Sequence, residues 1–348
     1  MAVTVAAPSA VRLPFTERGP VSDAVMRHLS GSTEHVDHTE LAQRAVARTP
    51  DACRDEDLAL ALFTLYASSY GSIDPLAPDL EWDPHLIATR QVLEHSLEEA
   101  LRAAVPAPAL PTAEKGAVAR ALFSLTKPSP GPSLSRHVAT RATAIQAKEL
   151  LVQRSVYTLR EADPHSWAIP RLHGRAKAAL VEIQADEYGG GRVEHMHSAM
   201  FATAMRGMGL DDAYGAYVDA VPALTLTSHN MMSMFGINRR LIGAIVGHLA
   251  AFEMTSSIPS RMYADGLRRL GFGTDVTDYF DVHVEADAVH EQIAGRDLAG
   301  ALAEDSPEAL SDIMFGAAAC MAVDAWVDEH ILDAWSRGES SLRTGALL

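Results

Sequence analysis

Cysteine is nearly absent from this chain. Only Cys53 and Cys320 occur among its 348 residues. Two cysteines that lie so far apart in the sequence are too few for a disulfide framework, a CxxC redox pair or a zinc site built from thiolates. Any chemistry at a site in this chain is therefore expected from other side chains.

Positive charge is also scarce. The chain has 29 Lys and Arg residues against 45 Asp and Glu residues, which gives a net charge of −16. Such a surface repels phosphate backbones and anionic lipids, so we expect no nucleic-acid partner. No apolar run approaches the length of a membrane span, and residues 1–15 lack the basic flank and uninterrupted apolar core of a signal peptide. We expect a cytoplasmic protein with no membrane partner.

Proline is scarce in the second part of the chain. Thirteen of the 18 prolines lie at or before Pro132. Because proline interrupts helices and lacks a backbone donor, the later part should contain long unbroken helices and the earlier part shorter ones. This contrast predicts an N-terminal tail and helical region over residues 1–130, followed by the main domain over residues 131–348.

Alternating patterns of β-branched residues, which would indicate strands, are nearly absent, so we predict an all-α protein. Apolar residues recur at steps of three and four, which is typical of helices, over residues 36–70 and 84–105. Five longer stretches are also compatible with helix, at about residues 134–160, 175–208, 222–253, 276–294 and 307–335. Five long helices with short connections predict a helical bundle.

One predicted helix has potential metal ligands along one face. His283, Asp287 and His290 are spaced at i, i+4 and i+7. At about 100° per residue these side chains fall within an arc of roughly 60°, so they point the same way. The surrounding residues of this helix are largely apolar. Polar groups on such a helix are expected to face a shared partner in the bundle interior.

A second set surrounds a glycine triplet. Glu187, Glu194 and His197 are spaced at i, i+7 and i+10, so they share one side if the helix continues through Gly189–Gly191. Two interpretations of the glycines are open: a plain break that leaves Glu187 outside any site, or a distortion that turns Glu187 toward it. Glu161 closes the helix predicted at residues 134–160 and could add a further carboxylate.

Together these positions offer four carboxylates and three imidazoles but no thiolate. Such donors suit non-haem iron or manganese better than structural zinc, and seven ligands suit two ions with bridging carboxylates. Either set alone is more often a solvated or supporting feature, so a helical protein without metal also remains open. We expect Glu253, at the end of the third long stretch, to support a ligand or form a buried ion pair rather than bind metal.

Over roughly residues 135–335 the pattern resembles the haem-oxygenase-like diiron oxidases and oxygenases. In that family a Glu ends the first core helix, an E-x-x-H motif lies on the second and an H-x-x-x-D-x-x-H motif lies on the third. The segments DPHSWAIPRL (163–172) and GHLAAFEMTSS (247–257) resemble the branch that oxygenates nitrogen, which has an extra carboxylate seven residues before the E-x-x-H glutamate. The resemblance implies a haem-oxygenase-like bundle whose metal ligands are Glu161, Glu187, Glu194, His197, His283, Asp287 and His290.

The resemblance also implies an activity. An N-oxygenase of this kind would use two iron ions, O2 and an external electron donor to oxidise an amine, guanidine or 2-aminoimidazole nitrogen of a small molecule in natural-product biosynthesis. The products would be N-hydroxy, nitroso or nitro compounds. A homodimer is implied as well, formed through the helical region at residues 36–125. Two alternatives remain open: oxidative C–C cleavage or desaturation of an amino or fatty acid, and a haem-binding or non-catalytic helical protein.

Overall fold

The computed structural model describes residues 13–32, 36–73, 77–128 and 131–343, apart from the side chains of residues 78 and 285–288. All regular structure in these residues is helical, which confirms the all-α prediction. The α-helices are α1 (Pro20–Leu29), α2 (His38–Val46), α3 (Glu56–Tyr70), α4 (Pro84–Ala104), α5 (Lys115–Leu125), α6 (Leu134–Thr140), α7 (Ala144–Thr158), α8 (Asp163–Ser166), α9 (Gly174–Glu187), α10 (His197–Gly207), α11 (Ala223–Ile237), α12 (Ile242–Arg269), α13 (Thr274–Gln292), α14 (Ala301–Asp305) and α15 (Leu310–Ser336). Short 3₁₀ turns are η1 (Pro78–Leu80), η2 (Ile169–Arg171), η3 (Gly189–Gly191), η4 (Val193–His195), η5 (Val218–Ala220), η6 (Arg239–Leu241) and η8 (Pro307–Ala309), and η7 (Ile293–Gly300) is a π-helix.

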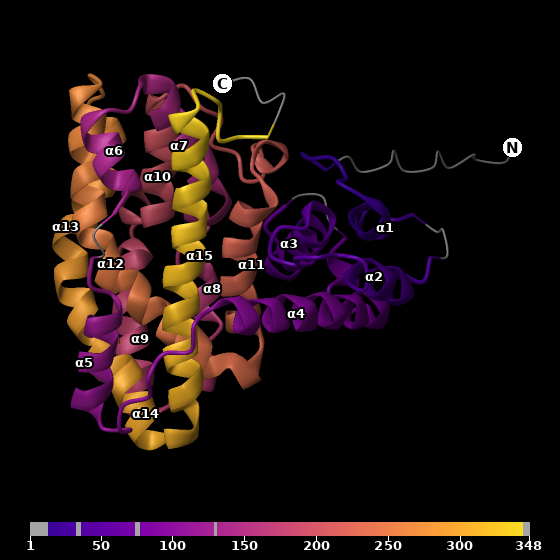
Figure 1. Ribbon diagram of the computed structural model, residues 1–348, viewed down its shortest axis with the longest axis horizontal. Coiled ribbons are helices and arrows are strands. Elements are labelled where there is room, and N and C mark those ends of the chain that lie inside the picture. Colours follow the sequence, from indigo (N-terminus) through magenta and orange to yellow (C-terminus); the bar gives the residue numbers. More distant parts are fainter. Residues whose placement is uncertain (1–12, 33–35, 74–76, 129–130, 344–348) are drawn as a thin grey trace, which may run out of the picture.

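The long helices form a bundle, and α1 to α4 lie at one side of it (Figure 1). Helix α3 packs against α11, which joins this side layer to the bundle. Helix α5 precedes residue 130 but packs against η7 within the bundle. The boundary at residue 130 and the homodimer contact through residues 36–125 remain predictions.

Besides the stretch that contains the glycine triplet, two of the predicted long helices are each divided in the structure. The stretch at residues 222–253 was predicted as one helix, but α11 ends at Ile237 and α12 continues to Arg269. Asn238 has an extended backbone between them, and its side chain donates to the carbonyl of Met234 at 3.0 Å. Competition of this kind between an asparagine side chain and the helix favours a break. The stretch at residues 134–160 is likewise divided where Thr143 caps α7.

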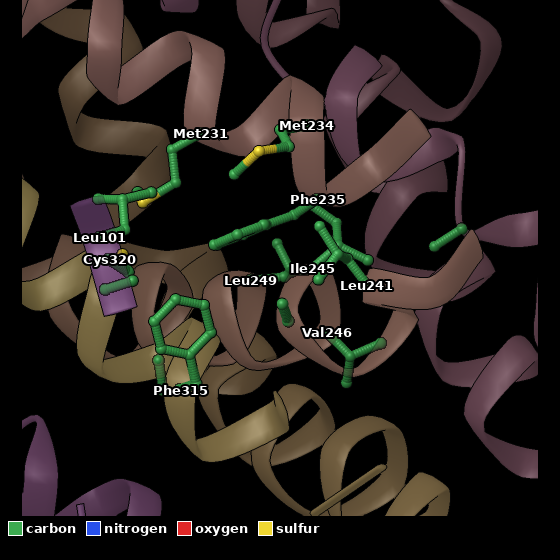
Figure 2. Close-up of a cluster of buried hydrophobic side chains, with 14 of the residues drawn as sticks. Leu101, Met231, Met234, Phe235, Leu241, Ile245, Val246, Leu249, Phe315 and Cys320 are labelled. Atoms are coloured by element: carbon green, nitrogen blue, oxygen red, sulfur yellow. The ribbon is translucent and has the colours of Figure 1, made fainter. Parts of the chain in front are cut away.

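Helices α12 and α15 cross at very short distance. A β-carbon at Gly247 would lie 1.8 Å from the carbonyl oxygen of Ile313, and one at Gly316 would lie 2.0 Å from that of Ala244. Only glycine fits at such backbone contacts. Apolar side chains of α4, α11, α12 and α15 fill the adjoining core, where Phe235 and Phe315 meet edge to face (Figure 2).

Two helical stretches in the described part of the chain are long and apolar enough to cross a membrane by composition alone. They are Arg239–Arg269 and Pro307–Ser336, and the most apolar windows of these stretches are 61% and 56% buried. They contain α12 and α15, which pack together in the bundle. Because a core helix passes the same test, these stretches are weak indications of a membrane span.

Candidate metal centre

Glu161 enters the bundle from the turn that follows α7. The next residue, Ala162, has a φ of 77° and is the one non-glycine residue with positive φ in the described chain. Its carbonyl accepts a hydrogen bond of 2.8 Å from Gln184 on α9, which fixes the turn against the next helix. This unfavourable conformation for a residue with a β-carbon is therefore held by its neighbours. The turn leaves the Glu161 side chain 5% exposed.

Glu187 is the last residue of α9, and the glycine triplet follows it. The helix does not continue through the glycines, so the condition under which Glu187, Glu194 and His197 would share one side of a helix is not met. Gly189, Gly190 and Gly191 all have positive φ, which residues with a β-carbon rarely adopt. The chain breaks after Glu187, as in the first interpretation, yet Glu187 is buried inside the bundle, as the second requires.

His197 begins α10 after this break. Its Nδ1 atom is buried and lies 2.9 Å from Oε2 of Glu187, close enough for an ion pair but without the geometry of a regular hydrogen bond. Its ring centroid lies 4.3 Å from that of His283 on α13. Burial alone would lower the pKa of His197, but the nearby Glu187 carboxylate outweighs burial and raises it.

Tyr279 contacts two of the candidate metal ligands, Glu161 and His283. Its hydroxyl lies 3.0 and 2.9 Å from the two carboxylate oxygens of Glu161, to which it donates, and its backbone carbonyl lies 2.6 Å from Nδ1 of His283. When Nδ1 donates to that carbonyl, Nε2 keeps its lone pair, as a metal ligand requires. Nε2 lies 3.8 Å from Oε1 of Glu161. Burial would raise the pKa of Glu161, but His283, His197 and Tyr279 outweigh burial and lower it.

His290 lies between two carboxylates. Its Nδ1 atom is 3.5 Å from Glu253, and its Nε2 atom is 3.0 Å from Asp186 on α9. Burial disfavours the cationic imidazole, but these two carboxylates outweigh burial and raise the pKa of His290 to about 9. Burial also raises the pKa of Glu253. Glu253 thus forms the buried ion pair expected from the sequence.

The donors gather into two groups that share one residue. Ligand atoms of Glu161, Glu187, His197 and His283 lie within 4.8 Å of one another, and so do those of Glu187, Glu253 and His290. A cavity of about 10 Å³, which is room for roughly one water-sized particle, lies among these carboxylates. Buried carboxylates and imidazoles that face one another suit a cation, which would take over the role of the imidazole protons. The residues present therefore fit a metal centre.

Two predicted ligands are not among these groups. Glu194 lies in η4 and is exposed, because the break after Glu187 turns this segment outward. Asp287 belongs to α13, but its side chain lies outside the described residues. Instead, Glu253 supplies the further carboxylate in the second group, beside Glu187 and His290. The spacing of residues in the sequence could not reveal this, because Glu253 belongs to a different helix.

Comparisons with known proteins agree with this centre. A model of the family described as iron-containing redox enzyme matches residues 148–325. Nitrosourea synthase from Streptomyces achromogenes subsp. streptozoticus is 30% identical over 149 residues. That alignment covers 42% of this chain and 31% of nitrosourea synthase, so the chain matches about a third of the length of this relative.

Proposed function

Because this chain belongs to the family of iron-containing redox enzymes, we propose that it is a diiron oxygenase that uses O2 to oxidise a nitrogen atom of a small molecule. The observation that carries the proposal is the position of Glu187, which belongs to both groups of buried donors. A carboxylate has two oxygens and can bridge two ions. An oxidoreductase of this kind has an oxygen-rich and imidazole-rich centre without thiolate, as observed here.

In this proposal Glu161, Glu187, His197 and His283 would hold one ion. Glu187 and His290 would hold the other, together with Asp287 and Glu194 as the family resemblance implies. Glu194 would reach the metal by a rearrangement of the η3 and η4 turns. Iron bound here would supply the redox chemistry with O2, and an external donor would supply electrons.

The protein's own residues prepare this chemistry. The Tyr279 hydroxyl holds the Glu161 carboxylate in place, and the Tyr279 carbonyl fixes the tautomer of His283. Asp186 accepts a hydrogen bond from Nε2 of His290, which leaves the other ring nitrogen directed into the centre. The burial of these ligands excludes bulk water and strengthens their electrostatic interactions.

The choice of nitrogen as the oxidised atom is supported by the similarity to nitrosourea synthase. The name of that protein states that it makes a nitrosourea, which contains a nitrogen–oxygen bond. We propose an amine, guanidine or aminoimidazole nitrogen of a natural-product precursor as the target. The extra carboxylate that the resemblance implies is the sequence feature consistent with this branch.

The experiment that tests the proposal counts metal and follows oxygen. Protein loaded anaerobically with ferrous iron should hold close to two irons per chain. Exposure to ¹⁸O2 with candidate amines and a reductant should give a product with labelled oxygen on nitrogen, detected by mass spectrometry. Loss of a carbon fragment or of two hydrogens without added oxygen would instead support C–C cleavage or desaturation. A Soret band after haem addition, with no bound iron, would support the haem-binding alternative.

A further inference from the structure

Two buried histidines connect the candidate metal centre with a second, larger cavity. The larger cavity has a volume of about 330 Å³ and lies between α7, α11, α12 and α15. His248 of α12 lines this cavity, and His165 of α8 lines the cavity of about 10 Å³ among the carboxylates. Nε2 of His165 and Nδ1 of His248 lie 3.1 Å apart and share a hydrogen bond. A single hydrogen bond therefore joins the two cavities.

The other nitrogen of each ring has accessible surface, although the two side chains are only 1% and 2% exposed. In the described part of the chain, neither Nδ1 of His165 nor Nε2 of His248 has a hydrogen-bond partner, and neither is among the enclosed polar atoms without one. The surface of each nitrogen therefore faces the cavity that its ring lines. A row of four ring nitrogens thus runs from the larger cavity to the metal centre.

The main chain holds both rings in position. Helix α8 packs against α11, where a β-carbon at Gly236 would lie 2.2 Å from the carbonyl oxygen of Pro164, the residue before His165. Gly247, the residue before His248, lies at the close crossing of α12 with α15. Neither histidine can move with its backbone unless these close helix contacts are lost.

Both imidazoles are neutral near pH 7. Burial lowers the pKa of His165 to about 4, against the opposing effect of Glu161, and burial lowers the pKa of His248 well below its ordinary value. A neutral imidazole has one N–H donor and one acceptor nitrogen. Two such rings can share a hydrogen bond in either direction, so the proton between them can belong to His248 or to His165.

The side chains that line both cavities are less suited to move a proton. They are Tyr157, Phe252 and Ser256. Phe252 has no polar side-chain atom, and the Ser256 hydroxyl donates to the backbone carbonyl of Glu253 at 3.2 Å. Burial and the charge of Glu161 raise the pKa of the Tyr157 hydroxyl well above its ordinary value, so this group retains its proton.

The geometry points to a proton-transfer path: we infer that His248 and His165 carry protons between the larger cavity and the metal centre. A proton binds to Nε2 of His248, the Nδ1 proton of His248 passes to Nε2 of His165, and the Nδ1 proton of His165 enters the small cavity. One proton enters and one leaves, so both rings end neutral and in the other tautomer. When the hydrogen bond opens, each ring exchanges its proton with water in its own cavity, and the starting tautomers return.

The use of this path rests on the proposed function. When one atom of O2 is inserted into an N–H bond, the second atom is reduced to water with two electrons from the external donor and two protons. Glu161, Glu187, His197, His283 and His290 are all buried, so these protons need a route through the protein. The larger cavity has room for several water molecules, which can supply them.

The first test is independent of iron. In chelated protein labelled with ¹⁵N-histidine and studied by NMR at pH 8, the ring nitrogen shifts distinguish protonated from unprotonated nitrogens. We expect two tautomers, averaged or resolved, for His165 and His248. His330 is the control and should keep one tautomer, because its Nε2 donates at 3.0 Å to the carbonyl of Ser341, which can only accept.

The second test uses iron-loaded protein and variants that cannot pass a proton. His165→Gln and His248→Gln should each still hold two irons but form product roughly ten- to hundredfold more slowly. His137→Gln changes a histidine that packs against Trp335 and lines neither cavity, so it should leave the rate unchanged. Imidazole should restore much of the rate of His248→Ala, whereas pyrrole, a ring of the same shape without an acceptor nitrogen, should not.

The path is overturned by one fixed tautomer on each ring, by full rates in both glutamine variants, or by a loss of rate that only follows loss of iron. Equal rescue by pyrrole and imidazole would also overturn it, because a ring that only fills space needs no second nitrogen. Two tautomers in a protein that binds no iron or oxidises no nitrogen would refute the proposed function alone. Product formation by the unmodified protein, with one fixed tautomer on each ring, would refute the path alone.

Discussion

The Nδ1 atom of His197 lies 2.9 Å from Oε2 of Glu187, although the helix that carries Glu187 ends before the helix that carries His197 begins. The two side chains converge because the chain between them turns through glycines with positive φ. A continuous helix would hold them in fixed register along one face. The observed contact depends instead on the conformation of a short irregular segment.

Replacement of Gly189 tests this dependence. Gly189 has a φ of 68°, and an added β-carbon would lie 2.6 Å from backbone atoms of His195 and Met196. We expect Gly189→Ala to cost about 1–3 kcal/mol of unfolding free energy and to lower iron content, because the turn that aligns Glu187 with His197 must shift. Denaturant unfolding and metal analysis measure the two effects.

A control is available within the triplet. Gly191 also has positive φ, but a β-carbon there would meet nothing within 4 Å. Gly191→Ala should therefore show a backbone cost of about 1 kcal/mol with iron content near that of the unmodified protein. Equal loss of iron in both variants would show that strain, and not the contact with residues 195 and 196, controls the centre.

The shared carboxylate gives a prediction about stoichiometry. Because Glu187 belongs to both donor groups, Glu187→Gln should reduce iron from two ions to fewer than one per chain, as measured by plasma mass spectrometry. Glu182→Gln, which changes an exposed residue of the same helix, should leave two irons. Retention of both ions in Glu187→Gln would rule out a bridging role.

The exposed position of Glu194 can be tested by carboxyl labelling. If this residue becomes a ligand, a carbodiimide should modify it several-fold less in iron-loaded protein than in chelated protein, because a bound carboxylate is shielded. Exposed Glu182 should be labelled equally in both states. Equal labelling of Glu194 would remove it from the ligand set and leave Glu253 as the remaining glutamate at that end of the centre.

Asp324 and Asp328 of α15, which line the cavity between α7, α11, α12 and α15, give a pH-dependent prediction. Burial, opposed in part by Arg154, raises the pKa of Asp324 to about 6, and burial together with the charge of Asp324 raises the pKa of Asp328 to about 7. The unfolded chain releases these protons near pH 4. The corresponding stability is present below pH 4 and is lost as pH rises through 7. Asp328→Asn should therefore raise Tm by roughly 2–4 °C at pH 8 and by less at pH 5.

Asp297, a surface aspartate, allows a comparison by calorimetry because its pKa is lowered instead of raised. Asp297 forms ion pairs with Lys115 and Arg175, and its hydrogen bond from Lys115 lowers its pKa. Asp297→Asn should lower Tm slightly at both pH 5 and pH 8, because this carboxylate is charged throughout. An Asp328→Asn effect of equal size at both pH values would contradict the raised pKa.

The sequence predicted where helices occur better than where they are interrupted. His283 and His290 lie on one uninterrupted helix, so their periodic spacing correctly placed both side chains in the bundle interior. The same reasoning left a break and a distortion open at Gly189–Gly191, because three glycines allow a change of direction that periodicity cannot represent. Whether Asp287 and Glu194 bind metal stays a prediction.

Contacts between helices that are far apart in the sequence leave no periodic pattern that would reveal them. Glu253 of α12 meets His290 of α13, and Arg154 of α7 faces the same cavity as Asp324 of α15. No fixed spacing relates such pairs, since tertiary packing decides which helices become neighbours. Arg154 and the two cavity aspartates were therefore not singled out from the sequence.

The crossing at Gly247 and Gly316 has a consequence for how this scaffold can diverge. The backbones of α12 and α15 are in direct contact at these glycines, so the two helices cannot slide past each other without losing the contact. Glu253 belongs to one of these helices and Asp328 to the other. The span between Glu253, at the candidate metal centre, and Asp328, at the cavity between α7, α11, α12 and α15, is thereby fixed by the main chain, so a change in the size of this cavity would have to come from residues on α7 and α11.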